Sequence, residues 1–252
     1  MPNCWANCLG DCDEKQSREH IVSRSLFESD LVDIVGFPWC KTPMRVGKDA
    51  VTRKILCVKH NNLLSELDQA AKNVFEAFRE QSNVADRFPA GVVPTKHSTS
   101  IIDALRLERW LLKTLINVSY EGKLVISSNV TAPGLPDRNL VEIAFGRQQF
   151  SGSSGMYVAT AIGQNLFSAD VVQFAPLIKN ETQVVGALFT LRGLHLVLMI
   201  DPSVSAPGEF AFNRFMPPSW RGLSLSRKFE RIDYAPRPYF IAHQIYFDWG
   251  GR

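Results

Sequence analysis

Two long stretches of the sequence repeat apolar residues at the spacing of an α-helix. The first runs from Asn61 to about Gln81, with apolar residues at Leu63, Leu64, Leu67, Ala70, Ala71, Val74, Phe75 and Phe78. The second runs from about Ser98 to Val118, with apolar residues at Ile101, Ile102, Leu105, Trp110, Leu111, Leu112, Leu115 and Ile116. Apolar residues at this period line one face of a helix and pack it against a core. The pattern therefore predicts two helices, and Ser98 or Ser100 is expected to cap the second.

Short apolar runs separated by Gly, Pro and Ser dominate the chain from Lys123 onward. This texture predicts strands over residues 123–127, 141–145, 157–162, 171–174, 184–191, 194–200 and 239–247. One more is expected over 31–35, and residues 52–56 are expected to form the last approach to Cys57. Arg192-Gly193 predicts a tight turn, so the apolar stretch 184–200 is expected to form a hairpin rather than a membrane span. The predicted fold class is α+β, with a mainly antiparallel second half.

Residues 83–97 interrupt the pattern with Pro89, Gly91 and Pro94. Proline and glycine punctuate structure in this way, so this stretch is expected to be a linker. It would divide the chain into a first domain over residues 1–82 and an α+β domain over residues 98–252. We expect the second domain to position substrate, sense a signal or bind a partner.

Composition and charge narrow the function only slightly. The chain has 252 residues, of which 45% are hydrophobic and 21% charged, as in an ordinary globular protein. The net charge of +3 does not by itself indicate nucleic acid. Lys and Arg are concentrated in residues 41–60 and 214–237, and such stripes either contact phosphates or form a solvated surface. No basic stretch followed by an apolar run opens the chain, so a cytoplasmic protein without a membrane partner is expected.

Three of the five cysteines lie close together as Cys4-x3-Cys8-x3-Cys12. In a chain without an export signal, such clustering favours metal ligation over disulfides. Structural zinc takes four thiolate or imidazole ligands, commonly as two close pairs, and Cys57-x2-His60 supplies one pair. We expect Cys4 and Cys12 to supply the other, with Cys8 as the alternate ligand.

Glu19-His20 and Asn61 are the candidates for catalytic chemistry. An imidazole such as that of His20 can take a proton from water near neutral pH, which is general-base catalysis. The Glu19 carboxylate can hold a divalent cation that polarises a phosphate. The amide oxygen of Asn61 can complete such a site, although Asn is also a favoured helix-capping residue.

Two charged helix residues are expected at the surface. Asp68 lies seven residues after Asn61 on the same helix face, and it can support a site there. The expected role of Asp68 is nevertheless that of a solvated acid. Lys113 is expected to extend its ammonium from the apolar second helix to solvent.

Taken together, the motifs between Cys4 and about Gln81 resemble those of the HNH endonucleases, the ββα-metal nucleases. Glu19-His20-Ile21-Val22 is similar to the acidic-His-Ile-Val/Ile-Pro run of the family's first strand. Leu56-Cys57-x2-His60-Asn61 is similar to the Leu-Cys-x2-Cys-His/Asn run at its helix. The resemblance covers about a third of the chain. An insertion around residues 36–48 is expected to fold away from the module.

The resemblance implies a zinc-stabilised ββα module that hydrolyses phosphodiester bonds with Mg²⁺ or Mn²⁺. It makes His20 the general base, Glu19 and Asn61 the ligands of the catalytic cation, and Cys57 and His60 half of the structural Zn²⁺ site. DNA is the substrate that it favours, and RNA stays open. A defence or toxin-like effector, triggered by a protein or small molecule at the second domain, is one role for such an enzyme. The alternative is a non-catalytic zinc-knuckle module that binds nucleic acid or protein.

Overall fold

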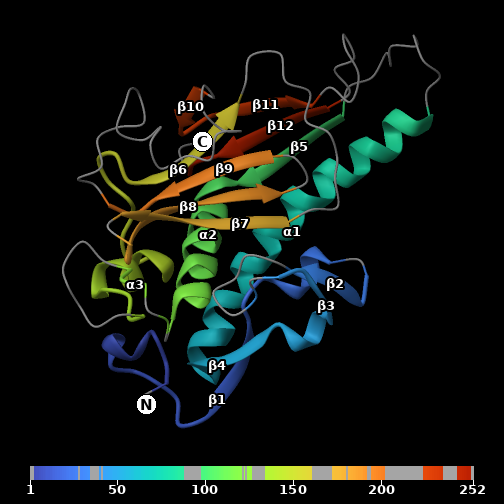
Figure 1. The fold of residues 1–252 in the computed structure, drawn as a ribbon. Helices are drawn as coiled ribbons and strands as arrows, with labels where there is room; N and C mark the ends of the chain where they lie inside the picture. Colours follow the sequence, from blue (N-terminus) through green and yellow to red (C-terminus); the bar gives the residue numbers. More distant parts are fainter. Residues whose placement is uncertain are drawn as a thin grey trace.

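The computed structural model is a mixed α and β structure (Figure 1). It describes residues 3–27, 29–34, 40, 42–87, 98–120, 122, 124–126, 134–160, 172–179, 181–191, 194–201, 224–234 and 243–250.

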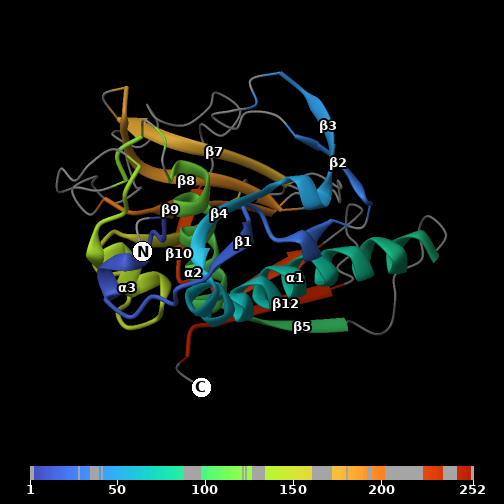
Figure 2. The ribbon, with the colours of Figure 1, turned by 90° about the horizontal axis from the view of Figure 1, so that it is seen from below.

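Strands β1 and β4 and helix α1 form the first unit. β1 (Gln16–His20) pairs antiparallel with β4 (Thr52–Cys57), and β4 continues directly into α1 (Val58–Arg87). The intervening chain holds the hairpin of β2 (Leu31–Ile34) and β3 (Met44–Gly47), which extends away from the β1–β4 pair in Figure 2. Three short 3-10 helices complete the unit: η1 (Asn7–Leu9), η2 (Arg24–Leu26) and η3 (Lys48–Ala50). The order strand, hairpin insertion, strand and helix agrees with the sequence pattern.

Helix α1 is longer than the apolar repeat predicts. It begins at Val58, next to Cys57, and ends at Arg87. Residues 83–87 of the predicted linker therefore continue the helix, and residues 88–97 lie outside the described part of the chain. The prediction that the helix ends at about Gln81 is wrong because a polar helical turn carries no apolar signal for its end.

Helix α2 begins later than predicted. Residues Ser98–Asp103 form strand β5, which pairs in parallel with β12 (His243–Asp248), and α2 spans Ala104–Ser119. The prediction of a cap at Ser98 or Ser100 is wrong, because both residues lie in β5. The Asp103 carboxylate is the cap and accepts a hydrogen bond from the Arg106 amide at 2.9 Å. The pairing partner lies some 145 residues away in sequence, so no local pattern reveals it.

Residues 141–145 were predicted as a strand, and this prediction is wrong. Residues 141–144 belong to helix α3 (Arg138–Ala144), and Phe145 is its C-cap. Asp137 caps the other end by accepting a hydrogen bond from the Leu140 amide at 2.8 Å. Gly146 follows with φ +70°, a conformation that favours glycine and ends the helix. A short apolar run fits a buried helix turn as well as a strand, and here the cap and the glycine decide.

The second half is mainly antiparallel, as predicted. Every pairing in the five-stranded sheet is antiparallel, and its strand order is β10-β6-β9-β8-β7. The predicted hairpin over 184–200 is confirmed by β8 and β9. Within residues 124–126, Val125 makes only an isolated bridge to Gln183. The strands of the five-stranded sheet are β6 (Gly155–Thr160), β7 (Val172–Lys179), β8 (Gln183–Leu191), β9 (Leu194–Met199) and β10 (Ser224–Arg227). A separate three-stranded sheet has the order β11-β12-β5, and its remaining strand is β11 (Arg231–Tyr234).

Helix α2 lies at the centre of the molecule, beside α1 and against β9 and β12 (Figure 1). Every residue from Trp110 to Ser119 is buried. One hydrophobic cluster runs from Trp5 and Leu56 in the first unit, through α2, to Leu196 and Ile245 in the sheets. The two predicted domains therefore share a core around α2. Among the described residues, no helix is both long and apolar enough to cross a membrane.

Candidate functional site: a metal centre and a buried polar network

The four predicted zinc ligands come together at the junction of β4 and α1. The ligand atoms of Cys4, Cys12, Cys57 and His60 all lie within 4.8 Å of one another. Cys4, Cys57 and His60 are buried and Cys12 is half-buried, whereas Cys8 is exposed and lies in η1. Of the three clustered cysteines, the structure thus selects the two that were expected.

The spacing of these atoms suits one tetrahedral ion. The Nδ1 atom of His60 lies 3.4 Å from Cys4 Sγ, 3.6 Å from Cys12 Sγ and 3.2 Å from Cys57 Sγ. A tetrahedron with zinc–sulfur bonds of about 2.3 Å and zinc–nitrogen bonds of about 2.0 Å has sulfur–nitrogen edges of about 3.5 Å. Three cysteines and one histidine are also a common donor set for structural zinc. The residues therefore fit a metal of this kind.

Backbone hydrogen bonds hold the cysteine loop against the strand–helix junction. The Trp5 amide donates to the Ile55 carbonyl at 3.1 Å, and the Val58 amide donates to the Lys15 carbonyl at 2.9 Å. Gly10 ends η1 with φ +79°, a conformation that L side chains rarely adopt. These contacts bring Cys4 and Cys12 back to Cys57, about fifty residues away along the chain.

The thiols differ in their readiness to ionise. Burial raises the pKa of the Cys4 thiol to about 12. Burial alone would also raise the pKa of Cys57, but hydrogen bonds from the His60 and Asp13 amides and from the neighbouring thiols outweigh it, so that pKa is lowered. Because a metal binds thiolates, the cluster must release protons when it is loaded.

Asp11 orients the histidine of the cluster, and the sequence analysis missed it. The Asp11 Oδ1 atom lies 3.0 Å from His60 Nε2, and Oδ2 accepts a hydrogen bond from Lys59 Nζ at 2.7 Å. The Lys59 hydrogen bond, followed by that of His60, lowers the pKa of the Asp11 carboxyl to about 2. A carboxylate on the outer nitrogen of a ligating histidine fixes the ring and leaves the other nitrogen for the metal. Its position directly before Cys12 was the only signal in the sequence.

The change Asp11→Asn is expected to weaken the affinity of the cluster for Zn²⁺ by about 10–100-fold, the usual effect of losing such a partner. Competition with a chromophoric chelator measures this affinity. Asp13→Asn is the matched control, because it makes the same charge change one residue beyond Cys12 and should leave the affinity unchanged. Equal affinities for the two variants would contradict the role given to Asp11.

Glu19 lies at the opposite end of β1 from the metal cluster and is buried against α2. Its Oε1 atom lies 2.7 Å from Lys113 Nζ, and the two side chains are only 5% and 2% exposed. Asn117 Nδ2 lies 3.3 Å from the same oxygen. The Glu19 carboxylate therefore binds two side chains of α2, the Lys113 ammonium and the Asn117 amide.

Lys113 is buried rather than at the surface as predicted, and Asp68 is only partly exposed, at 31%. Lys113 Nζ donates to both carboxylate oxygens of Asp68, at 3.0 and 3.2 Å. Asp68 also accepts a hydrogen bond from the Ser23 hydroxyl, whose oxygen accepts one from Trp110 Nε1 at 2.6 Å. The prediction of a solvated Lys113 is wrong, and Asp68 is only partly solvated, because each charge meets its partner from a different element. One ammonium thus joins carboxylates of β1 and α1.

Burial and charge act in opposite directions in this network. Burial raises the pKa of the Glu19 carboxyl, and the Lys113 ammonium offsets part of that effect. Burial alone would lower the pKa of Lys113, but the Glu19 and Asp68 carboxylates outweigh it and the pKa is raised. Lys113 is therefore held as an ammonium.

His20 ends β1, and its side chain is 29% exposed. Its Nε2 atom is 3.8 Å from Asp49 Oδ1, beyond hydrogen-bonding distance, and has no hydrogen-bond partner among the described residues. Asp49 is itself paired with Arg24 at 3.1 Å. Although the side chain as a whole is partly exposed, this nitrogen is itself buried and unpaired among the described residues.

Asn61 lies in the first turn of α1, and its Nδ2 atom donates to the Ser17 hydroxyl at 2.7 Å. Glu19 lies two residues after Ser17 on β1, but its recorded contacts are with Lys113 and Asn117. Asn61 thus contacts β1 at Ser17, and Glu19 belongs to the same strand, but the two side chains have different hydrogen-bond partners. In this arrangement they do not form the predicted catalytic cation site.

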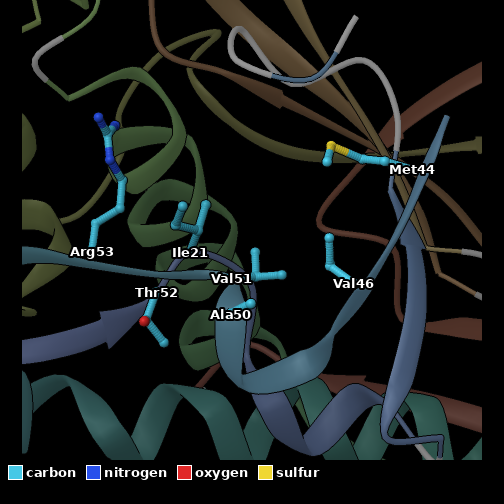
Figure 3. Close-up of a pocket in the computed structure, with 7 residues that line it drawn as sticks. All are labelled: Ile21, Met44, Val46, Ala50, Val51, Thr52 and Arg53. Atoms are coloured by element: carbon cyan, nitrogen blue, oxygen red, sulfur yellow. The ribbon is translucent and has the colours of Figure 1, made fainter. Parts of the chain in front are cut away.

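A pocket of about 270 Å³ lies beside β3 and the start of β4 (Figure 3). Its lining is mostly apolar, and in Figure 3 Arg53 and Thr52 point to opposite sides of β4. Thr52 is the cross-strand partner of His20, and Ile21 follows His20 in the chain. The lining residues are Ile21, Met44, Val46, Ala50, Val51, Thr52 and Arg53.

Three of the six basic residues in the stripe over residues 41–60 are paired with neighbouring acids. Lys48 Nζ lies 2.6 Å from Asp30 Oδ1, and the Arg45 guanidinium makes two hydrogen bonds of 2.9 Å to Asp33. Lys59 binds Asp11. Much of the second stripe, 214–237, lies outside the described residues. In the described part, the first stripe is therefore a partly paired surface.

No protein-family model, curated protein or solved structure matches this chain.

Proposed function

We propose that the chain is an HNH-type endonuclease that hydrolyses phosphodiester bonds, with DNA as the expected substrate and Zn²⁺ as the ion of the cysteine–histidine cluster. One observation carries the proposal. The strand that bears Glu19 and His20 pairs with the strand that ends in Cys57, and that strand continues directly into α1. The sequence motifs therefore lie on a strand–strand–helix unit of the kind that the resemblance implies, with the metal cluster at its junction.

His20 is the proposed general base. Its Nε2 atom is buried and has no hydrogen-bond partner among the described residues, so it can accept a proton from a water molecule that reaches it. Water that loses its proton to His20 would attack the phosphorus of a bound phosphodiester. The bond from phosphorus to one ester oxygen would break, and the departing alkoxide would take a proton from solvent and leave as an alcohol. The zinc cluster would hold β4 and α1 in register and take no part in this step.

We also propose that Glu19 and Asn61 bind Mg²⁺ or Mn²⁺, which requires both side chains to leave their present partners. Glu19 would have to exchange the Lys113 ammonium for the cation. The dependence of cleavage on the divalent cation therefore tests this component separately from the role of His20.

His20→Ala is expected to lower the rate of plasmid nicking by about 10²–10⁴-fold, the usual contribution of a general base. The assay measures conversion of supercoiled plasmid with Mg²⁺ or Mn²⁺, after the zinc content of each protein has been measured. His195→Ala is the matched control, because it removes a half-buried imidazole of the sheet that contacts Thr190. Full activity of His20→Ala would exclude His20 as the base.

The burial of Glu19 supports the second candidate, a non-catalytic module that binds nucleic acid or protein. In that case Lys113 and Glu19 are structural, and zinc is the only metal that the protein needs. The discriminating measurement is metal content after dialysis against Mn²⁺. One tightly held Zn²⁺ with no bound Mn²⁺ and no nicking favours the module, whereas a second, exchangeable ion favours the nuclease.

A further inference from the structure

Asn117 occupies a fully buried position on α2 that faces the first unit of the chain. Its Nδ2 atom lies 3.3 Å from the His20 carbonyl oxygen and 3.3 Å from Glu19 Oε1. Its Oδ1 atom accepts a hydrogen bond from Trp5 Nε1 at 3.0 Å. One amide group thus contacts both residues of the Glu19-His20 pair and the residue that follows the metal ligand Cys4.

The chemistry of these partners determines which way the amide points. An indole N–H is only a donor, so the amide oxygen must face Trp5. The carboxylate of Glu19 and the carbonyl of His20 are acceptors, so the NH₂ group must face them. An asparagine meets both demands, whereas an aspartate or a leucine of similar size cannot donate to either acceptor.

The contacts also define one face of α2. Trp110, Lys113 and Asn117 are spaced three and four residues apart, and they reach Ser23, Glu19 with Asp68, and Glu19 with His20. Glu108 of α2 contacts the sheet instead: it is buried and accepts a hydrogen bond from the Met156 amide of β6 at 2.7 Å. The second half of the chain therefore supplies polar groups to the end of β1.

We propose that Asn117 is a positioning residue for the candidate active site, holding the main chain of His20 from the second half of the chain. This inference rests on the proposed function. The His20 carbonyl belongs to the last residue of β1, where the ladder with β4 ends at the pair His20 and Thr52. The Ile21 amide of the same peptide unit donates to the Val51 carbonyl at 3.1 Å, and Asn117 holds its carbonyl side. Together the two bonds fix the main chain from which the imidazole side chain extends. The bond to Trp5 couples this position to the metal-binding loop.

Asn117→Asp tests the proposal, because the aspartate retains an acceptor for Trp5 but loses both donors. The test uses the full chain, with zinc content and thermal unfolding recorded for each variant. We expect kcat for plasmid nicking to fall by about 10²-fold, as expected for a misplaced catalytic group, with KM nearly unchanged. We also expect the ring resonances of His20 to shift in the NMR spectrum. Asn117→Ser is the second variant if Asn117→Asp does not fold, because the shorter side chain introduces no charge.

Thr114→Val is the matched control, because it removes one polar group of similar size from another buried position on the same helix. It should leave both kcat and the His20 resonances unchanged. If a folded, zinc-loaded Asn117 variant keeps the wild-type kcat and resonances, or changes them no more than Thr114→Val does, the positioning role is excluded. If the wild type itself does not cleave, the proposed function fails, and the His20 resonances alone then decide whether Asn117 positions that residue.

Discussion

Replacement of Lys113 by methionine is expected to lower the free energy of unfolding by about 3–5 kcal/mol, the usual cost of removing one partner from a buried ion pair. The ammonium lies 2.7 Å from Glu19 and 3.0 Å from Asp68, in a site where Lys113 is only 2% exposed. Methionine has a similar length and leaves little cavity, so the loss comes mainly from two carboxylates without a counter-ion. Chemical denaturation followed by circular dichroism measures the change.

Two further variants show that the loss comes from the charge network. Glu19→Gln combined with Lys113→Met removes one of the two stranded carboxylates, and it should be more stable than Lys113→Met alone. Lys72→Met is the matched control, because Lys72 forms an exposed pair with Glu76 at 3.5 Å. Such pairs contribute about 0–1 kcal/mol. A similar loss for Lys72→Met and Lys113→Met would contradict the structural role of the network.

Loss of the metal cluster is the other change with a large expected effect. Structural Zn²⁺ binds zinc-finger peptides with about 10–16 kcal/mol, and much of that free energy becomes folding free energy. Here Cys57→Ser removes a buried ligand at the β4–α1 junction, and Cys4, Cys12 and His60 then face each other without a complete site. We expect residues 3–20 to unfold locally while α2 and the five-stranded sheet stay folded, because those elements share a large apolar core.

Hydrogen exchange measured by mass spectrometry separates local from global unfolding. In Cys57→Ser, amides of residues 3–20 should exchange rapidly, whereas those of α2 residues 110–119 should stay protected. Cys8→Ser is the matched control, since Cys8 is exposed and lies outside the cluster. Protection of residues 3–20 in the metal-free protein would show that the metal is not needed to hold this segment.

Much of the candidate metal site was predictable because its signals are local in the chain. Cys57 and His60 are three residues apart, and the apolar repeat of α1 starts just beyond them, so a strand–knuckle–helix unit follows from the sequence alone. Cys4 and Cys12, which were preferred over Cys8, are also the cysteines that lie beside Cys57 and His60. Asp11 was missed because its role depends on the outer nitrogen of His60, which only the folded loop brings within 3.0 Å.

The surroundings of Glu19 and His20 depended on contacts that no local pattern contains. Glu19 and Asp68 meet Lys113 across 94 and 45 residues, and Asn117 reaches His20 across 97. A charged residue in an amphipathic helix is usually solvated, and only a partner from elsewhere makes its burial favourable. The helix α3 was mistaken for a strand for a similar reason, since its short apolar run fits either structure and its place beside the metal loop is a tertiary fact. Sequence alone therefore determined which cysteines cluster with His60 and the strand–helix unit that carries the cluster, whereas the tertiary structure decided that α2 holds the Glu19-His20 end of that unit.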